Sequence, residues 1–575
     1  MDWRFKTHLN QTIAPLDYND GRNQLDVIND VLEALDEHDI VQLHGAVGTG
    51  KSVIALHVIS EHHKGIISVP TKNLEDQYVD NYCGETGYKV TARNGEAMNV
   101  NNLRGRSNFR CPNPPPSINQ KHVKCDHERL PCTRHLIEPE TRAGIAQNCP
   151  HWSPIYDPKN LPEAFNTHNK TIHKYQSISG VRAYYETKQP CPYYKQFRHF
   201  IPDGAIIMNS AKWEAETWIA RKPKVPVEII DEADAFLDGL TYELSFTNRT
   251  TSLLNREKVF DESETTQLEI ELRQYYERYK NQEEFELVKS SDLESMIKGV
   301  FKASETSSSP RLTNLNMKLG VLLSLAEYVY AIAVKNRATT GFKFYIPRLD
   351  ITLNELLERS GKIILMSATH HTPINYRDIF NIQPEIIEAQ KTNPGTLYLM
   401  TPKDGWLPNI TYKTWKNRET RHKYHQILEN QLRVAAKPCY VLVHAFRYLP
   451  DRYKRDKTET HANYWTRPEH PEVKFSTRMD RGVDLKDNQC RSIILLKHPY
   501  PSLGDRFLKT LRKQVGDRKF WRYYRDIANR ELLQQCGRAI RNKEDWCQVY
   551  SPDYNVVKTL KKIWQGKLIQ KNYHT

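Results

Sequence analysis

The chain has 575 residues, too many for one ordinary hydrophobic core, so its length predicts several domains. It has no N-terminal signal pattern and no apolar run long enough to span a bilayer, so we expect a cytoplasmic protein without membrane contact. The net charge of +14 favours a polyanionic partner such as nucleic acid, although a generally basic proteome would produce the same charge.

Residues 15–36 begin with turn residues and continue with apolar positions at helical spacing. Arg22 and Gln24 stand at the start of this predicted helix. A glutamine amide can donate to and accept from an adenine edge at once, so Gln24 is a candidate nucleotide contact. An ordinary surface glutamine is the alternative interpretation.

A glycine-rich loop, HGAVGTGKS, follows at residues 44–52, between a predicted buried strand at 39–44 and a predicted helix at 52–63. In this context its backbone N–H groups and the helix N-terminus favour phosphate. Lys51 would reach the β- and γ-phosphates of ATP, and the Ser52 hydroxyl would bind Mg²⁺. The loop residues that we assign to the nucleotide site are Gly45, Gly48, Thr49, Gly50, Lys51 and Ser52.

A second strand and helix are predicted over 65–78, broken at Pro70-Thr71-Lys72. From about 100 to 200 the alternation of strands and helices lapses. Five of the ten cysteines lie in this interval: Cys111, Cys125, Cys132, Cys149 and Cys191. Their clustering in a chain that is not a secreted disulfide scaffold requires another reason.

Buried strands return at 203–213 and 225–236, and Asp231 and Glu232 emerge at the end of the second. With a phosphate loop upstream, Asp231 would hold the Mg²⁺ bound by Ser52 and Glu232 would polarise the attacking water. An ordinary helix cap is the alternative for such paired acids.

Residues 240–345 predict a mainly helical insertion, with a loop at 302–312 and an apolar helix over 316–334. The segment 361–371 returns to the sheet as a buried strand that ends in Ser367-Ala368-Thr369.

A second α/β domain begins with a predicted strand at 437–446 and continues with sheet segments at 476–485 and 491–501. A helix is predicted over 528–546. Gln534, Gly537, Arg538 and Arg541 have spacings that share one helix face. Two arginines so placed suit a polyphosphate, and a solvated basic face is the alternative.

In order, these segments resemble the motifs of a superfamily 2 helicase, specifically the XPD/DinG-like family of iron–sulfur DNA helicases. GAVGTGKS resembles motif I, PTKNLEDQ motif Ia, DEAD motif II, MSATH motif III, RMDRGVDL motif V and QQCGRAIR motif VI. Arg22 and Gln24 match the R-x-Q element of the family. GRSNFRC and CPYYKQF resemble the segments that carry the first and last cluster cysteines.

The resemblance implies an α/β fold with two RecA-like domains and two insertions in the first. The implied divisions are 1–100, 201–239 and 346–385 for helicase domain 1, 101–200 for the iron–sulfur insertion, 240–345 for the helical arch and 386–575 for helicase domain 2. The family often has DEAH at motif II, whereas position 234 here is Asp. This departure puts in doubt the contact that the fourth position makes to motif III or VI.

The resemblance also implies a [4Fe–4S] cluster, for which we expect Cys111, Cys125, Cys149 and Cys191 as ligands, with Cys132 as an alternative to Cys125. Zinc is the alternative metal, although the chain has no C-x-x-C pair.

The expected activity is an ATP-dependent DNA helicase that moves 5′-to-3′ along single-stranded DNA as a monomer and opens forked DNA. The second domain would contribute Gly482, Asp484, Gln534, Arg538 and Arg541, with Arg541 as the arginine finger. Basic and aromatic candidates for the DNA path are Lys72, Arg106, Tyr193, Tyr194, Trp213, the run 506–526 and the tail after 553.

Three other interpretations share these motifs: an ATPase that remodels protein–DNA complexes without unwinding, a nuclease–helicase fusion and a scaffold with a relic nucleotide site. The fusion is disfavoured because the R-x-Q element begins at residue 22. The compact length fits a prokaryotic or viral member of the family, and a role in DNA repair is among the pathways left open.

Overall fold

The computed structural model covers residues 1–575. It describes all of them except residues 1, 93–94, 117, 119–121, 128–129, 131, 133–148, 161–167, 283, 306–309, 337–338, 391–392, 405, 457–458, 460–463, 478–486, 541–542 and 575.

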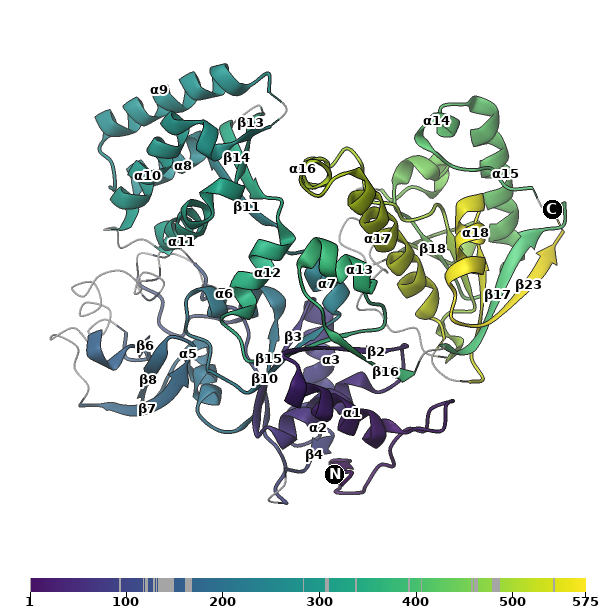
Figure 1. The fold of residues 1–575 in the computed structure, drawn as a ribbon, viewed down its shortest axis with the longest axis horizontal. Coiled ribbons are helices and arrows are strands. Elements are labelled where there is room, and N and C mark those ends of the chain that lie inside the picture. Colours follow the sequence, from purple (N-terminus) through teal and green to yellow (C-terminus); the bar gives the residue numbers. More distant parts are fainter. Residues whose placement is uncertain are drawn as a thin grey trace.

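The first domain is built on a seven-stranded parallel sheet with the strand order β16-β2-β15-β10-β3-β9-β5 (Figure 1). Alternate residues of a strand point to opposite faces, so Ile66 and Ile67 of β3 enter two different cores. Helices α1 (Gln24–Glu37), α2 (Lys51–Glu61) and α3 (Lys72–Tyr82) cover one face. The strands are β2 (Ile40–Gly45), β3 (Lys64–Val69), β5 (Val100–Asn102), β9 (Gly204–Asn209), β10 (Val227–Asp231), β15 (Lys362–Ser367) and β16 (Glu385–Gln390).

The opposite face of this sheet is covered by α6 (Ser210–Trp218), α7 (Ala233–Asp238) and α12 (Leu349–Leu357). The expected boundary of the second domain, at residue 386, falls inside β16. Because β16 pairs with β2 in parallel, the first domain extends to the end of that strand.

The second domain also contains a seven-stranded sheet, with the order β19-β20-β18-β21-β22-β17-β23. Its pairs are parallel apart from β19 with β20. The strands are β17 (Asn393–Pro402), β18 (Cys439–Leu442), β19 (Trp465–Arg467), β20 (His470–Ser476), β21 (Ser492–Leu495), β22 (Trp546–Tyr550) and β23 (Gly566–Tyr573). The helices include α15 (Arg418–Val434), α16 (Arg506–Val515), α17 (Asp517–Gly537) and α18 (Tyr554–Ile563). The predicted fold class of two α/β domains is confirmed.

The cysteine-rich insertion contains an antiparallel sheet that the sequence did not indicate. Its strand order is β6-β8-β7, with β6 at Ile155–Tyr156, β7 at Lys170–Ser177 and β8 at Gly180–Thr187. Most residues of β7 are exposed or half-buried, so its apolar pattern is weak and only the pairing with β8 identifies it as a strand.

The second insertion combines helices with an antiparallel sheet of order β11-β14-β13-β12. Its helices are α8 (Asn248–Arg256), α9 (Glu262–Tyr279), α10 (Ser291–Glu305) and α11 (Pro310–Ser324), and its strands are β11 (Tyr242–Thr247), β12 (Phe285–Glu286), β13 (Tyr330–Lys335) and β14 (Thr340–Ile346). The expectation of a mainly helical insertion is therefore incomplete.

The apolar helix predicted over 316–334 is wrong in its second half. Helix α11 ends at Ser324, and Tyr330–Lys335 instead form β13, where they pair with β14 along their whole length. A short apolar run fits either state, and the strand partner decided between them. The predicted loop at 302–312 is shorter than expected, because α10 continues to Glu305 and α11 begins at Pro310.

The helix predicted over 528–546 begins earlier and ends earlier. Helix α17 runs from Asp517 to Gly537 with Arg538 at its C-cap, and Trp546 already belongs to β22. The expected single helix face therefore stops before Arg541, which lies outside the described residues. Trp546 is extended because β22, which it begins, pairs with β21 and β17.

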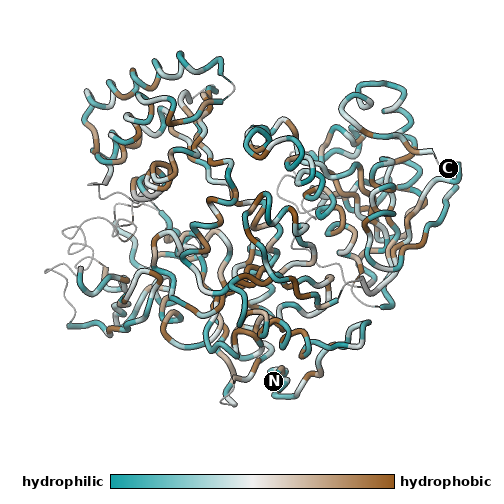
Figure 2. The backbone as a smooth tube through the Cα atoms, viewed as in Figure 1, coloured by the Kyte–Doolittle hydropathy of each residue, from teal (hydrophilic) through white to brown (hydrophobic). Residues whose placement is uncertain are grey.

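Hydrophobic residues gather around the two sheets and between the arch helices, while the outer surfaces are largely hydrophilic (Figure 2). Within the described ranges, no helix is both long and apolar enough to cross a membrane.

Candidate active site

The glycine-rich loop connects β2 to α2 and has the form of a phosphate cradle. Gly48 and Gly50 have φ angles of 88° and 71°, which side chains disfavour. Gly50 is the N-cap of α2 and has no side chain to satisfy the first N–H groups of the helix. The Lys51 ammonium lies 2.6 Å from the carbonyl oxygen of Gly45 and 3.2 Å from that of Ala46. The loop therefore presents both N–H donors and a cation to an anion.

Gln24 lies directly against this loop. Its amide accepts a 2.8 Å hydrogen bond from the backbone N–H of Leu16 and donates a 3.3 Å one to the carbonyl of Gly50. Arg22 forms ion pairs with Asp20 and Asp30, and neither ion pair involves the glycine-rich loop. The sequence-predicted pair is thus divided: Gln24 supports the loop, and Arg22 anchors the start of α1.

The residues expected to hold Mg²⁺ meet around two tyrosines that the sequence did not indicate. The Tyr78 hydroxyl donates a 2.8 Å hydrogen bond to the Asp231 carboxylate. The Ser52 side chain lies near the hydroxyls of Tyr78 and Tyr82, where it acts to lower the pKa of both tyrosines against the effect of burial. Oxygen donors from three segments therefore converge, as a hard cation such as Mg²⁺ requires. Burial and the neighbouring carboxylate of Glu232 raise the pKa of Asp231 to about 7.

Glu232 is in the left-handed conformation, with φ 49° and ψ 48°, at the N-terminus of α7. Such a conformation is unfavourable for glutamate and is typical of functional positions held by their surroundings. The backbone N–H of Glu232 donates a 2.8 Å hydrogen bond to the Asp231 carboxylate, which fixes the turn. The Glu232 side chain consequently points toward the second domain, where Gln534 lies 3.4 Å away.

The two domains meet at Asp234, the unusual fourth residue of DEAD. Its carboxylate accepts hydrogen bonds from Ser367 at 2.7 Å, Thr369 at 2.9 Å and Gln534 at 2.7 Å. Ser367 and Thr369 belong to the MSATH segment, and Gln534 belongs to QQCGRAIR on α17. Asp234 therefore contacts both segments, so the contact that was in doubt for an Asp at the fourth position of the motif is present.

A buried charged cluster beside Asp234 was missed by sequence reasoning. Arg530 of α17 forms ion pairs with Asp234 at 3.1 Å, Asp238 at 2.8 Å and Asp526 at 3.0 Å. His371 lies between Asp238, at 3.3 Å, and Asp526, at 2.9 Å. Asp526 and Arg530 are four residues apart on α17, but Asp234, Asp238 and His371 reach them from distant parts of the chain, which no local pattern indicates.

The cleft between the domains contains a pocket of about 110 Å³ beside the glycine-rich loop. Its walls include Ala46 and Val47 of the loop, Thr369 of the MSATH segment, and Arg530 and Gln534 of α17. Two segments separated by nearly the whole chain thus form one cavity.

Three of the expected nucleotide contacts, Gly482, Asp484 and Arg541, lie outside the described residues, as does the whole segment RMDRGVDL. Arg538 is described, half-buried at the C-cap of α17. Among the described residues, the second domain therefore contributes Gln534 and Arg530 of α17 to this cleft.

The five cysteines of the first insertion gather in one place. Burial raises the pKa of the thiols of Cys111, Cys125, Cys149 and Cys191, and the proximity of Cys132 raises each of them further. Cys132 therefore lies near each of the other four thiols. The Arg106 guanidinium lies 3.5 Å from the Cys125 sulfur and 3.7 Å from that of Cys132.

Sulfur spacing bears on which metal fits. A single tetrahedral zinc ion, with Zn–S of 2.3 Å, needs sulfurs about 3.8 Å apart. No three cysteine sulfurs of the described residues approach within 4.8 Å of one another. The described thiols are therefore spaced more widely than the ligands of one tetrahedral zinc ion.

The aromatic candidates for base stacking are wrong. Trp213 is 1% exposed and donates its indole N–H to Glu228 at 2.6 Å. Tyr193 and Tyr194 are buried, and both stack on the Arg106 guanidinium. These rings fill the core between the insertion and the first sheet, whereas Lys72 is exposed at the start of α3.

The run 506–526 forms α16 and the first half of α17, which pack against the first domain and the arch. Tyr345 of the arch hydrogen-bonds Thr510 at 2.8 Å, and Tyr523 donates to Asp238 at 3.0 Å. Much of this basic and aromatic run therefore has a structural role between domains.

A phosphate cradle, paired acids and a glutamine supplied by a second parallel-sheet domain form one cleft between two α/β domains, as the resemblance to superfamily 2 helicases implies. The comparisons agree with this class. Residues 409–571 match the family model of the helicase C-terminal domain. No curated protein matches the chain in sequence.

Solved structures show the same fold over nearly the whole chain. A structure described as an XPD helicase has a TM-score of 0.56 at 15% identity and covers 95% of this chain and 99% of its own. An apo XPD structure has a TM-score of 0.52 at 14% identity and covers 95% and 100%. Xpd4 of S. tokodaii has a TM-score of 0.50 at 14% identity and covers 95% and 99%. The chain has the fold of XPD helicases, and the expected resemblance is confirmed.

Proposed function

We propose that this protein is an ATP-dependent DNA helicase that moves 5′-to-3′ along single-stranded DNA. The observation that carries the proposal is the contact of Gln534 with the acids after β10: the second domain completes a site whose phosphate loop and acids lie in the first. The net charge of +14 favours nucleic acid as the partner. Direction and preference for DNA come from the resemblance to the XPD/DinG-like family.

In this proposal the residues of the first domain bind and orient ATP. Lys51 moves from the carbonyls of Gly45 and Ala46 to the β- and γ-phosphates, and the N-terminus of α2 faces the same phosphates. Ser52 and Asp231 would hold Mg²⁺, which supplies charge neutralisation of the phosphates. Glu232 accepts a proton from the attacking water, and Gln534 orients the carboxylate that does so.

Coupling to movement follows from the same contacts. Helix α17 carries Gln534 and Arg530. These two side chains contact Asp234 after β10, and Gln534 also contacts Thr369 of the MSATH segment. A change in the phosphates at the loop is thereby transmitted to α17 and to the second domain. Arg538 and Arg541 are proposed to contact the γ-phosphate when the cleft closes.

For the cluster, we propose Cys111, Cys132, Cys149 and Cys191 as ligands of a [4Fe–4S] centre, with Cys125 as a fifth thiol beside Arg106. The shared position of Cys132 supports this choice over the set that includes Cys125 instead. When bound, the cluster would brace the insertion against the first sheet.

The test uses purified full-length protein with DNA substrates that carry either a 5′ or a 3′ single-stranded overhang. We expect unwinding only from the 5′ overhang and a DNA-stimulated ATPase that Lys51→Ala and Glu232→Gln abolish. The exposed variant Glu33→Gln is the matched control and retains activity. Unwinding only from the 3′ overhang would contradict the assignment, and ATP turnover without strand displacement would favour the remodelling alternative.

A further inference from the structure

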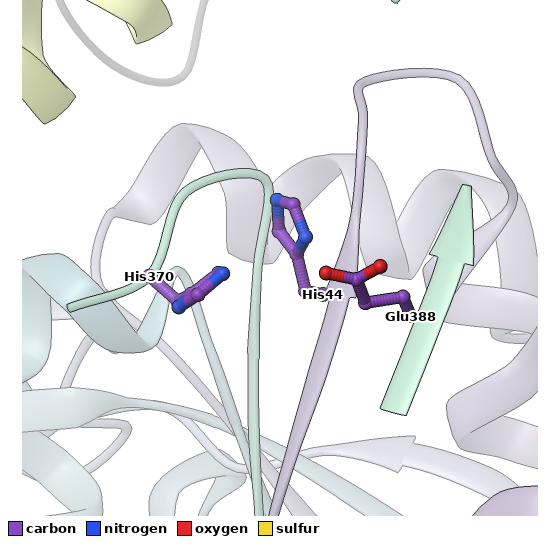
Figure 3. Close-up of side chains that lie close together, drawn as sticks. All are labelled: His44, His370 and Glu388. Carbon is purple, nitrogen blue, oxygen red and sulfur yellow. The ribbon is translucent and has the colours of Figure 1, made fainter. Parts of the chain in front are cut away.

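Three side chains with metal-binding atoms meet beside the glycine-rich loop, apart from the acids of the proposed Mg²⁺ site. They are His44 at the end of β2, His370 just after β15 and Glu388 at the end of β16 (Figure 3). One ligand atom from each residue lies within 4.8 Å of those from the other two. In Figure 3 the His44 ring stands between His370 and the Glu388 carboxylate.

The sheet itself produces this arrangement. β16, β2 and β15 are neighbours in the order of the first sheet, and all three run parallel. Glu388 is the Cα partner of His44 on one side, and Ser367 is its partner on the other. A register irregularity lies between Glu388 and Gln390, and such bulges commonly redirect a side chain.

Hydrogen bonds to backbone carbonyls prepare both histidines as ligands. Nε2 of His44 lies 3.2 Å from the carbonyl oxygen of Ala368, and Nδ1 of His370 lies 2.8 Å from that of His371. A carbonyl only accepts, so these nitrogens carry the hydrogens, and the other nitrogen of each neutral ring presents a lone pair. Metal-binding histidines are typically held in this way.

Burial supplies an independent observation. His44 is 7% exposed, and its Nδ1, the nitrogen left with a lone pair, is buried without a hydrogen-bond partner among the described residues. A buried acceptor without a partner costs free energy, about 1–3 kcal/mol, which a bound cation would offset.

We propose that His44, His370 and Glu388 form a binding site for a divalent transition-metal ion of the zinc class. Two imidazoles and a carboxylate suit Zn²⁺, whereas Mg²⁺ prefers oxygen ligands throughout. Zinc ligands lie about 3.4 Å apart, so the three side chains must approach slightly, which rotation of the half-buried His370 and Glu388 allows. Three protein ligands leave a fourth position for water.

Occupancy of this site would reduce ATP turnover, a consequence that rests on the proposed function. The ion would join the strand before the glycine-rich loop to the segment that carries Thr369, which contacts Gln534. It would also add positive charge near Lys51, whose ammonium lies 2.6 Å from the carbonyl of Gly45, the neighbour of His44. Both effects oppose the adjustment of the loop to phosphate.

The experiment is calorimetric titration of the full-length, iron-loaded protein with Zn²⁺ in millimolar Mg²⁺, with iron content measured on the same samples. We expect His370→Ala and Glu388→Gln to weaken one Zn²⁺ site by about tenfold or more. The exposed His422→Ala is the matched control and leaves that site unchanged. Far-UV circular dichroism confirms that each variant is folded, so that a loss of binding reports on the ligands.

Equal Zn²⁺ affinity and stoichiometry in the wild type and both variants would overturn the proposal. ATP turnover is measured separately: we expect Zn²⁺ to inhibit the wild type and to inhibit Glu388→Gln far less. If the protein hydrolysed no ATP at all, the proposed function would fail while the titration still decided whether the metal site exists.

Discussion

The amide of Gln534 on α17 donates a 2.7 Å hydrogen bond to the carboxylate of Asp234, which follows the acids at the end of β10. The same amide lies 3.0 Å from the Thr369 hydroxyl and 3.4 Å from Glu232. One side chain of the second domain therefore contacts three residues of the first. Asp234 accepts hydrogen bonds from both domains. A motif that ends in Asp instead of His therefore retains the link between the domains.

The first prediction concerns this link. Asp234→Asn removes the charge that pairs with Arg530 and replaces one acceptor oxygen by a donor that faces Ser367, Thr369 and Gln534. We expect DNA-stimulated ATP turnover to fall about tenfold or more, and the free energy of unfolding to fall by about 1–3 kcal/mol. Steady-state ATPase assays and chemical denaturation measure the two effects.

The exposed Asp36→Asn on α1 is the matched control for charge. Full ATPase activity in Asp234→Asn would show that the contact seen between Asp234 and Gln534 has no part in turnover.

A second prediction is a pH dependence of stability centred on His371. Burial and Arg530 oppose its protonation, but the carboxylates of Asp238 and Asp526 outweigh both and hold the pKa of His371 above its ordinary 6.5. A raised pKa in the folded state means that the contribution to stability is fully present below 6.5 and is lost as the pH rises through the folded value.

We therefore expect the unfolding temperature of the wild type to fall as the pH rises above 6.5, and to fall less steeply in His371→Gln. Differential scanning calorimetry at several pH values provides the measurement. Identical slopes in the two proteins would mean that His371 is not charged in the cluster.

The third prediction concerns the cysteines. Because Cys132 lies near each of the four other thiols, we expect Cys132→Ser to lose bound iron and its broad visible absorbance. Cys125→Ser should retain both. Iron analysis and visible spectra on anaerobically purified proteins measure this. Iron retained in Cys132→Ser but lost in Cys125→Ser would restore the original ligand set, and stoichiometric zinc in a colourless wild type would exclude the cluster.

A fourth prediction uses Glu214 on α6, whose pKa burial raises from 4.5 to about 7. The folded state therefore holds a proton that the unfolded state releases, so Glu214 costs stability increasingly as the pH rises from 4.5 to 7. We expect Glu214→Gln to raise the free energy of unfolding by about 1–3 kcal/mol at pH 8 and to have little effect at about pH 4.5.

Urea denaturation at both pH values measures this difference, with the exposed Glu85→Gln as control. A gain of equal size at both pH values would point to packing of the amide instead of the cost of burying a charge.

The sequence alone indicated the glycine-rich loop, the acids after β10 and both α/β domains. These features are local: a buried strand, a glycine loop and an amphipathic helix are encoded within about twenty residues, and their order along the chain indicates the class of motor. The same is true of α2 and α3, which begin within one residue of the predicted breaks.

Long-range pairing explains what sequence reasoning missed. Strand β13 was assigned to a helix because its apolar run fits both states until β14 is placed beside it. Trp213 and Tyr193 are aromatic residues of the kind that stack on bases, but in the folded protein both are buried in the hydrophobic core. Nothing near Arg530 in sequence indicates that Asp234 and Asp238 pair with it, and nothing near His371 indicates its contacts with Asp238 and Asp526.

The chain sequence by itself determined which residues can bind phosphate, because that chemistry depends on neighbours along the backbone. Only the tertiary structure decided which residues complete the site. Gln534 reaches Asp234 across 300 residues of sequence, and His44 meets Glu388 because β2 and β16 are adjacent in the sheet. Such contacts depend on strand order and domain packing, and a linear pattern carries no record of either.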